Sequence, residues 1–265
     1  MMHKLSTGLL AATAATPMVA LSMPLVERQD TPIVHLAGDS TMAPEGGGSG
    51  TIGWGGYLQY SLANTVDNRA IGGRSARSYT REGRFDEIAS ELVAGDFVVI
   101  EFGHNDGGSL TPTDNGRTDC PGDGDEVCST DVESGILTYV AYLENAARKF
   151  TDLAAYVIVS SPTPNNPWET GTFAYAPNRF TGYSEMVANE FENAIFIDHG
   201  QLVANEFERL GASTVDTYFP NDHTHTSPEG ADVVAQAFVR GLLCSDSNLA
   251  QYVTNSTSSV IGSCL

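Results

Sequence analysis

The chain has 265 residues, 41% of them hydrophobic and 17% charged, and its formal net charge at pH 7 is -20. This length allows one large domain or two small ones, and the composition is that of a globular protein, which excludes a mainly disordered chain. So acidic a surface argues against nucleic acids and anionic membranes as partners.

Residues 1–30 are predicted to be a secretory signal followed by a pro-segment. Lys4 gives a basic start, and Leu9–Leu21 is mostly apolar and leads into small residues. This stretch is short and a proline interrupts it, so we do not expect it to span a membrane. Glu27–Asp30 is interpreted as a trimmed pro-segment, and the secreted, extracellular protein is expected to begin near Thr31.

Residues 31–265 alternate between short apolar, β-like runs and amphipathic stretches, with no repeat and no linker. This alternation predicts a single domain with a parallel sheet and helices on both of its faces. The predicted strands are Ile33–Ala37, Val66–Ala70, Phe97–Phe102, Tyr156–Ser160 and Ile195–Asp198. The predicted helices are Gly56–Asn64, Ile136–Leu153, Arg179–Phe191, Gln201–Leu210 and Pro228–Leu243.

Four cysteines fit a secreted protein, and they allow three disulfide connectivities. We favour the local pairs Cys120–Cys128 and Cys244–Cys264, which close two short loops. The first pair would staple Asp106–Val132, the longest predicted loop. One glycosylation sequon begins at Asn255, in a polar tail rich in serine and threonine.

Polar turns with glycine follow the first three predicted strands. Ser40 follows the first, Gly72–Ser75 the second, and Gly103–Asp106 the third, while Asp222–His225 lies near the other end of the chain. Ligands bind at the carboxyl ends of the strands in open parallel sheets. The three turns are therefore expected to meet at one edge, which nothing in the folding of a sheet requires.

These residue types suit acyl transfer through serine. The Ser40 hydroxyl needs a base to take its proton, and His225 is expected to be that base, with Asp222 fixing its tautomer. The tetrahedral oxyanion needs preorganised donors, each worth about 2.7–4 kcal/mol. The candidate donors are the backbone N–H groups of Ser40 and Gly73 and the side-chain amide of Asn105.

Several motifs also have simpler interpretations. Gly-Asp-Ser alone is an ordinary turn, and His223 is a rival for the base, although we interpret it as a structural residue or one at the edge of the substrate. His104 is open between substrate contact and packing. Gly48–Gly53 matches a dinucleotide fingerprint but follows no strand directly, so no nucleotide cofactor is expected.

Two other function classes stay open from the residues alone. A metal-dependent deacetylase would use Asp222, His223 and His225 as ligands, but it leaves Ser40 unexplained, so no metal is expected. The second class is a carbohydrate-binding protein that catalyses no reaction.

The order Gly-Asp-Ser, Gly, Gly-x-Asn-Asp, Asp-x-x-His resembles the SGNH, or GDSL, hydrolase superfamily, and longer runs resemble the fungal rhamnogalacturonan acetylesterases. The resemblance covers about Ile33 to Leu265. It implies a flavodoxin-like three-layer α/β/α fold, the triad Ser40–Asp222–His225, and oxyanion donors from Ser40, Gly73 and Asn105. The longer runs are Leu36–Ala43, Gly73–Ser78, Phe102–Gly108, Thr163–Gly171 and Asp222–Ser227.

The resemblance also implies a secreted esterase that removes acetyl groups from acetylated rhamnogalacturonan, a pectic polysaccharide. The alternative is an esterase of another acetylated plant polysaccharide. We expect no metal, no other cofactor and a monomer.

Positive charge gathers in one segment of this acidic chain. Five of its arginines fall between positions 69 and 84, where only Glu82 opposes them. The segment surrounds Gly73, so its field would attract an anionic polymer to the nucleophile. Arg74 and Arg77, with His223, are the predicted substrate contacts.

Overall fold

Five parallel strands form the central sheet of the computed structural model, which describes residues 31–265. Their order is β2-β1-β3-β6-β7, and each neighbouring pair is parallel. The predicted parallel sheet of five strands is therefore confirmed, whereas the predicted signal and pro-segment lie outside the described residues. The strands are β1 (Val34–Gly38), β2 (Val66–Asn68), β3 (Phe97–Glu101), β6 (Tyr156–Ser160) and β7 (Ala194–Ile197).

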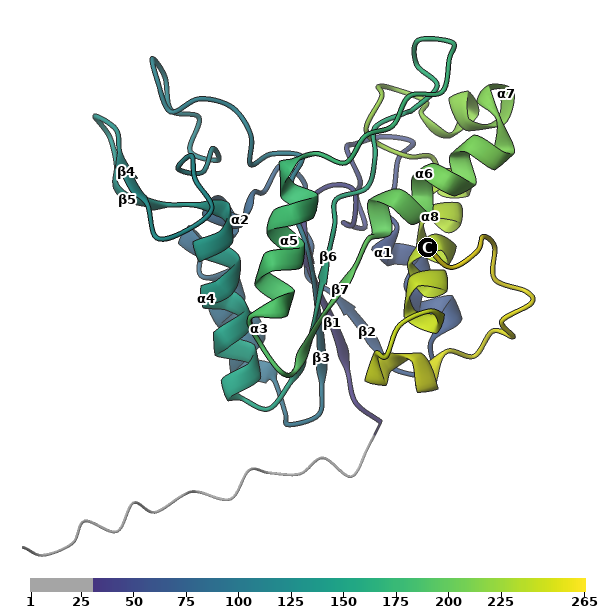
Figure 1. Ribbon diagram of the computed structural model, residues 1–265, viewed down its shortest axis with the longest axis horizontal. Coiled ribbons are helices and arrows are strands. Elements are labelled where there is room, and N and C mark those ends of the chain that lie inside the picture. Colours follow the sequence, from purple (N-terminus) through teal and green to yellow (C-terminus); the bar gives the residue numbers. More distant parts are fainter. Residues whose placement is uncertain (1–30) are drawn as a thin grey trace, which may run out of the picture.

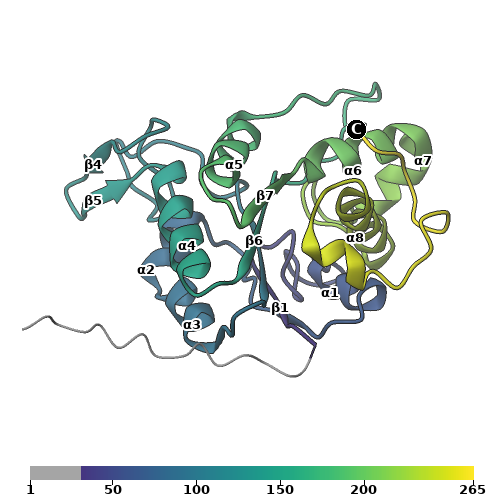
Figure 2. The same cartoon turned by 60° about the horizontal axis from the view of Figure 1, so that its bottom comes forward.

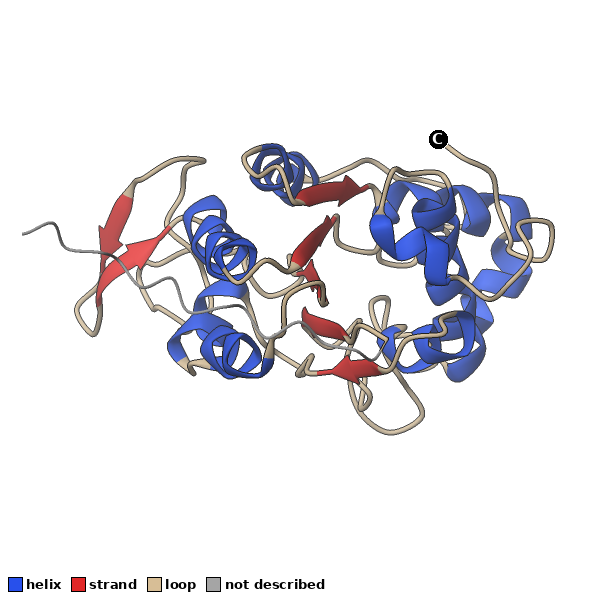
Figure 3. Ribbon diagram, turned by 90° about the horizontal axis from the view of Figure 1, so that it is seen from below, coloured by secondary structure: helices blue, strands red, loops and turns tan. Residues whose placement is uncertain are grey.

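Helices cover both faces of the sheet and give three layers (Figures 1 and 3). One face carries α2 (Ala76–Arg81), α3 (Arg84–Glu91), α4 (Tyr139–Asp152) and α5 (Arg179–Asn189). The other face carries α1 (Gly55–Leu58), α6 (His199–Leu210), α7 (Ala212–Val215) and α8 (Pro228–Leu243). Within residues 31–265, no helix is both long and apolar enough to cross a membrane.

The pleat of the strands divides the core into two clusters. Leu36, Val99 and Ile158 lie in register across β1, β3 and β6 and pack under α8 and α6. Val98 and Val157, one position earlier on their strands, point to the opposite face. Both faces are buried, which explains why these strands are continuous apolar runs in the sequence.

Local capping sets the helix ends. Pro228 is the first residue of α8, and the Ser227 side chain accepts a hydrogen bond from the Gly230 N–H, as expected of a helix start. The predicted helix Ile136–Leu153 begins too early, because its first two residues belong to β5 (Ser134–Leu137). This strand pairs with β4 (Val127–Ser129) in an antiparallel hairpin, and α4 begins only after the Thr138 cap.

Helices α2 and α3 were not predicted from the sequence. Helix α2 is rich in arginine and serine, and α3 is so short that its buried side consists of Phe85 and Ile88, so neither gives the extended apolar stripe of a longer helix. The start of α2 is nevertheless encoded in a capping box, in which Ser75 and Ser78 exchange side-chain and backbone hydrogen bonds.

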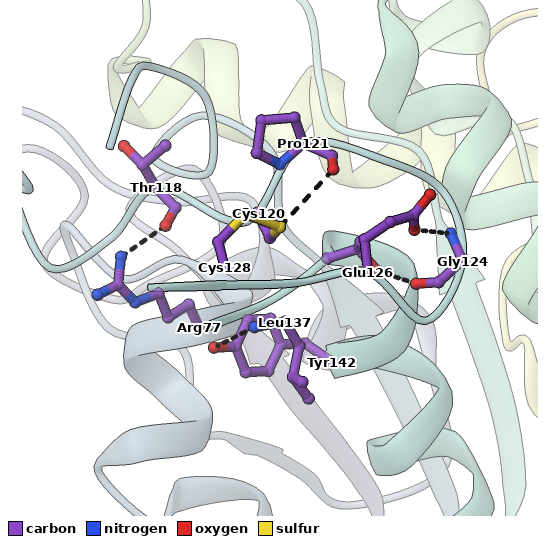
Figure 4. The surroundings of a disulfide bond; sticks show 10 residues. Arg77, Thr118, Cys120, Pro121, Gly124, Glu126, Cys128, Leu137 and Tyr142 are labelled. Atoms are coloured by element: carbon purple, nitrogen blue, oxygen red, sulfur yellow. Dashed lines mark hydrogen bonds between the residues drawn. A yellow bond between two sulfur atoms is a disulfide. The ribbon is translucent and has the colours of Figure 1, made fainter. Parts of the chain in front are cut away.

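Both expected local disulfides are present. Cys120–Cys128 ties the long loop to the β4–β5 hairpin beside Arg77 (Figure 4). Cys244–Cys264 closes the C-terminal segment, which folds back around α8 (Figure 2). Asn255, in the expected glycosylation sequon, lies half-exposed in that segment.

Candidate functional site

Ser40 lies just beyond the carboxyl end of β1, on a turn made by its neighbours. The Asp39 carboxylate accepts hydrogen bonds from the Thr41 N–H and hydroxyl, both at 2.9 Å. A Cβ on Gly38 would stand 2.7 Å from the Met42 sulfur, so the turn needs glycine there. The strands on either side of β1 connect in opposite directions, and this switch point is where such sheets hold ligands.

The three predicted triad residues lie in one chain of hydrogen bonds. The Ser40 Oγ is 2.8 Å from His225 Nε2, and His225 Nδ1 is 2.7 Å from Asp222 Oδ2. Because Nδ1 faces a carboxylate, it carries the proton, which leaves Nε2 as an acceptor for the Ser40 hydroxyl. This is the protonation that a general base needs before a serine attacks.

Asp222 is held in its ionised form. Its Oδ1 accepts hydrogen bonds from the N–H groups of Thr224 and His225, at 2.7 and 2.8 Å. Partial burial raises its pKa, but the hydrogen bonds from His225 and Thr224 outweigh burial and lower the pKa to about 2. A permanent negative charge therefore faces the ring nitrogen that must become positive during proton transfer.

Three donors converge on the space in front of Ser40. Ser40, Gly73 and Asn105 line one cavity of about 310 Å³ together with His225. Within residues 31–265, neither the Ser40 nor the Gly73 backbone N–H has a protein acceptor. Gly73 has φ +75°, a conformation that favours glycine. Both N–H groups are thus free to donate to a bound oxygen.

The Asn105 amide has a defined orientation. Its Nδ2 donates to the Arg74 carbonyl at 3.1 Å, and its Oδ1 accepts from the Arg117 guanidinium at 3.1 Å. A carbonyl can only accept and a guanidinium can only donate, so the amide cannot be flipped. The second N–H of Nδ2 remains available to the cavity.

Asp106 ties the Asn105 loop to the segment that carries Gly73. Its Oδ1 accepts a hydrogen bond from the Ala76 N–H at 2.7 Å, at the start of α2. Burial raises the pKa of Asp106 well above its ordinary value, and burial likewise raises that of Asp39. The two acids are buried, and their hydrogen bonds hold the turns that carry Ser40 and Asn105.

Gly47 packs directly against the imidazole of His225. A Cβ added at this position would lie 2.2 Å from the ring, and the backbone there is not in the left-handed region. The ring therefore excludes a side chain from this position. Sequence reasoning did not single out Gly47, because its contact with His225 joins residues distant in the chain.

The three predicted substrate contacts, Arg74, Arg77 and His223, differ in burial and in their partners. Arg77 is fully buried and donates to Asp114 and Glu133, so its predicted contact with substrate is wrong. Arg74 is half-buried and paired with Glu82. His223 is exposed, and its Nδ1 faces Glu169 at 3.1 Å. For Arg74 and His223 the substrate contact stays a prediction.

Arg117 is the site residue that sequence reasoning missed. It lines the cavity beside Ser40 and contacts Asn105 from a distant part of the long loop. No local pattern marks it, since it lies outside the arginine-rich segment. Among residues 31–265, no group of three or more His, Cys, Asp or Glu side chains is arranged to hold a metal ion.

Comparisons with known proteins agree with this geometry. The GDSL-like lipase/acylhydrolase family matches residues 36–233, which include Ser40 and His225. The chain is 56% identical over 224 residues to the rhamnogalacturonan acetylesterase of Emericella nidulans, covering 83% of this chain and 89% of that protein. It is 29% identical over 219 residues to YesY of Bacillus subtilis, a probable rhamnogalacturonan acetylesterase, covering 79% and 91%.

A solved structure shares the fold. The catalytic mutant of Axe2, an acetylxylan esterase from Geobacillus stearothermophilus, superposes with a TM-score of 0.52 at 21% identity. The match covers 79% of this chain and 93% of that one. The three-layer α/β/α fold predicted from the sequence is thereby confirmed.

Proposed function

This chain belongs to the GDSL-like lipase/acylhydrolase family, and from that premise we propose that it is an esterase that removes acetyl groups from acetylated rhamnogalacturonan. The observation that carries the proposal is the hydrogen-bonded chain from Ser40 through His225 to Asp222, set beside unused donors in one cavity. The similarity to the Emericella nidulans enzyme supports the substrate.

The reaction begins when the Ser40 Oγ attacks the acetyl carbonyl carbon. The hydroxyl proton passes to His225 Nε2, and the carbonyl electron pair moves onto the oxygen, where Ser40, Gly73 and Asn105 donate hydrogen bonds. Collapse breaks the ester bond, and the sugar oxygen leaves with the proton held by His225. An acetyl-serine remains.

Water completes the cycle. His225 takes a proton from a water molecule, whose oxygen attacks the acetyl-serine carbonyl and forms a second oxyanion in the same place. Collapse returns the proton to the Ser40 Oγ and releases acetate. Asp222 stays ionised throughout and stabilises the imidazolium in both halves of the reaction.

The test is acetate release by the purified protein from acetylated rhamnogalacturonan and, in parallel, from acetylated xylan. We expect the pectic polymer to be the better substrate, and Ser40→Ala to abolish release from both. Faster release from xylan would make the protein an esterase of another plant polysaccharide. Binding without any acetate release would make it a carbohydrate-binding protein, and activity lost in excess EDTA would indicate a metal-dependent deacetylase.

The same proposal places the protein outside the cell, as a monomer with residues 1–30 removed and Asn255 glycosylated. The two disulfides support an oxidising compartment. Mass spectrometry of the protein recovered from culture medium tests the new N-terminus and the sugar on Asn255, and size-exclusion chromatography tests the oligomeric state.

A further inference from the structure

Arg117 carries a positive charge that no acidic side chain among residues 31–265 neutralises. Within residues 31–265 it forms no ion pair, and its guanidinium donates only to the Asn105 Oδ1, at 3.1 Å. A Cβ on Gly73 would lie 3.9 Å from the Arg117 Nη1, so the guanidinium stands beside one oxyanion donor while it contacts another. The side chain is exposed at the cavity in front of Ser40.

The other arginines near the cavity are already paired. Arg74 contacts Glu82, and Arg77 contacts Asp114 and Glu133. The remaining three arginines of the predicted cluster also contact acids, namely Arg69 with Asp67 and Glu91, Arg81 with Glu133, and Arg84 with Glu82. The positive segment seen in the sequence is therefore largely neutralised, and Arg117 is the guanidinium left for a ligand.

Hydrogen bonds from Asn115 and from the buried Arg77 hold the loop that carries Arg117 in place. Asn115 Oδ1 accepts hydrogen bonds from the Arg117 N–H at 2.8 Å and the Thr118 N–H at 3.0 Å. The buried Arg77 donates to the Thr118 carbonyl at 2.6 Å and to both oxygens of Asp114 (Figure 4 shows the contact with Thr118). These hydrogen bonds from Arg77 lower the pKa of Asp114 to about 2. Arg77 thus holds the loop rather than the substrate.

We propose that Arg117 binds the carboxylate of a uronate residue next to the acetylated sugar, an inference that rests on the proposed esterase function. A guanidinium presents a planar fork of N–H donors that matches a carboxylate, and most of the Arg117 donors are unused. In a protein of formal net charge -20, one unpaired cation beside the nucleophile also gives an anionic polymer a preferred place to dock.

Binding is measured in the Ser40→Ala background, where no turnover occurs. The ligands are a deacetylated rhamnogalacturonan oligosaccharide and the same oligosaccharide with its carboxylates methyl-esterified, titrated by calorimetry. Adding Arg117→Gln should weaken binding of the acid by about tenfold or more and leave the neutral ester unchanged. Arg148→Gln, which removes an equal charge from α4, should change neither.

Kinetics separate carboxylate binding from the positioning of Asn105. On acetylated rhamnogalacturonan, Arg117→Gln should raise KM more than it lowers kcat, whereas a role through Asn105 alone would lower kcat equally on 4-nitrophenyl acetate. Three results would overturn the proposal. The Ser40→Ala protein could bind the two oligosaccharides with equal affinity, it could fail to bind the acid, or Arg117→Gln could weaken binding of both oligosaccharides equally. Failure of the wild type to release acetate from the polymer overturns the esterase function instead, and the calorimetry still decides on Arg117.

Discussion

The imidazole of His225 packs against Gly47, a residue without a side chain. Gly47 lies flat against the imidazole, and a methyl group there would need the space of the ring itself. The backbone at Gly47 is not in the left-handed region, and the three atoms nearest to an added Cβ all belong to the His225 ring. A side chain at Gly47 would therefore force either this loop or the His225 ring to move.

We therefore predict that Gly47→Ala displaces the His225 ring and lowers kcat on a small acetyl ester by about 10²-fold or more, since a displacement of about 1 Å can cost that much. Protein stability should change little, because the loop is at the surface. Gly182→Ala is the control, since its Cβ meets nothing within 4 Å in the middle of α5. Unchanged kcat in Gly47→Ala would show that the ring tolerates the methyl group.

The lowered pKa of Asp222 allows a prediction of how activity depends on pH. Its pKa of about 2 keeps it ionised through the mildly acidic range, so protonation of His225 alone should reduce activity as pH falls. A plot of log kcat/KM against pH should fall with a slope of about one on the acid side. A slope of about two above pH 3.8, the ordinary Asp value, would mean that Asp222 also takes up a proton there.

Asp222→Asn tests the same group by its removal. The variant should lose about 10⁴-fold in kcat, because the amide no longer stabilises the imidazolium or fixes the tautomer. The acid fall in activity should also move to lower pH, since the imidazolium loses the negative charge that faces its Nδ1. A variant with the wild-type pH profile would place Asp222 outside the triad.

At the scale of elements, one buried carboxylate joins the carboxyl ends of β3 and β6 to the starts of α1 and α6 and, through His199, to α8. Glu101, the last residue of β3, accepts hydrogen bonds from Trp54 Nε1 at 2.8 Å and from Ser160 Oγ at 2.6 Å. Its Oε2 also faces His199 Nδ1 at 2.8 Å, and His199 Nε2 lies 2.9 Å from the Val234 carbonyl of α8. Both ring nitrogens of His199 therefore lie within hydrogen-bond distance of an oxygen atom.

Replacing Glu101 should therefore destabilise the fold strongly. Glu101→Leu leaves the Trp54, Ser160 and His199 donors without an acceptor, and we expect a loss of about 3–5 kcal/mol in the free energy of unfolding. Glu101→Gln should cost less, because its amide still accepts from Trp54 and can donate to a neutral His199 Nδ1. Urea denaturation measures the free energy of unfolding of both variants. Equal losses of stability would show that the hydrogen bonds to Glu101 are not the source of its contribution.

The elements also show how far the sequence determines what can be predicted. The five strands were predictable as short apolar runs, and the helix from Pro228 to Leu243 was predictable because its burial follows the helical period. Ser40, Gly73 and Asn105 were predictable as a group because the carboxyl ends of parallel strands meet at one edge. His225 follows no strand and was predicted from its spacing to Asp222. Contacts between loop residues follow no period, so those of Arg117 with Asn105 and of Gly47 with His225 could not be predicted.

The predicted substrate contact of Arg77 is wrong for a related reason. A local excess of positive charge is visible in the sequence, but the acids that neutralise it come from elsewhere in the chain. Asp114 and Glu133 are distant from Arg77 in sequence and meet it only in the fold. Charge clusters in an acidic protein therefore predict ion pairs as readily as they predict ligands.

At the scale of the whole molecule, two sets of carboxyl groups give the stability opposite dependences on pH. Burial raises the pKa values of Asp39, Asp106 and Asp119 in the folded protein. The folded state therefore binds these protons more tightly than the unfolded state, and stability is lost as pH rises from 3.8 through the raised values. Asp114 and Asp222 have folded pKa values of about 2, so their stabilisation is present above 3.8 and is lost as pH falls toward 2.

The two dependences predict a maximum of thermal stability on the acid side of neutrality. Repulsion within a chain of formal net charge -20 acts in the same direction as the buried acids, because protonation of surface carboxylates relieves it. Tm measured by calorimetry should therefore rise as pH falls from the raised pKa values of the buried acids toward 3.8. It should drop as pH falls further from 3.8 toward 2, where the stabilisation from ionised Asp114 and Asp222 is lost. Asp106→Asn, which cannot ionise, should flatten the rise, whereas high salt should remove only the part due to surface repulsion. A Tm that rises steadily from pH 5 to 8 would show that the buried carboxyl groups are not the ones that set the stability of this fold.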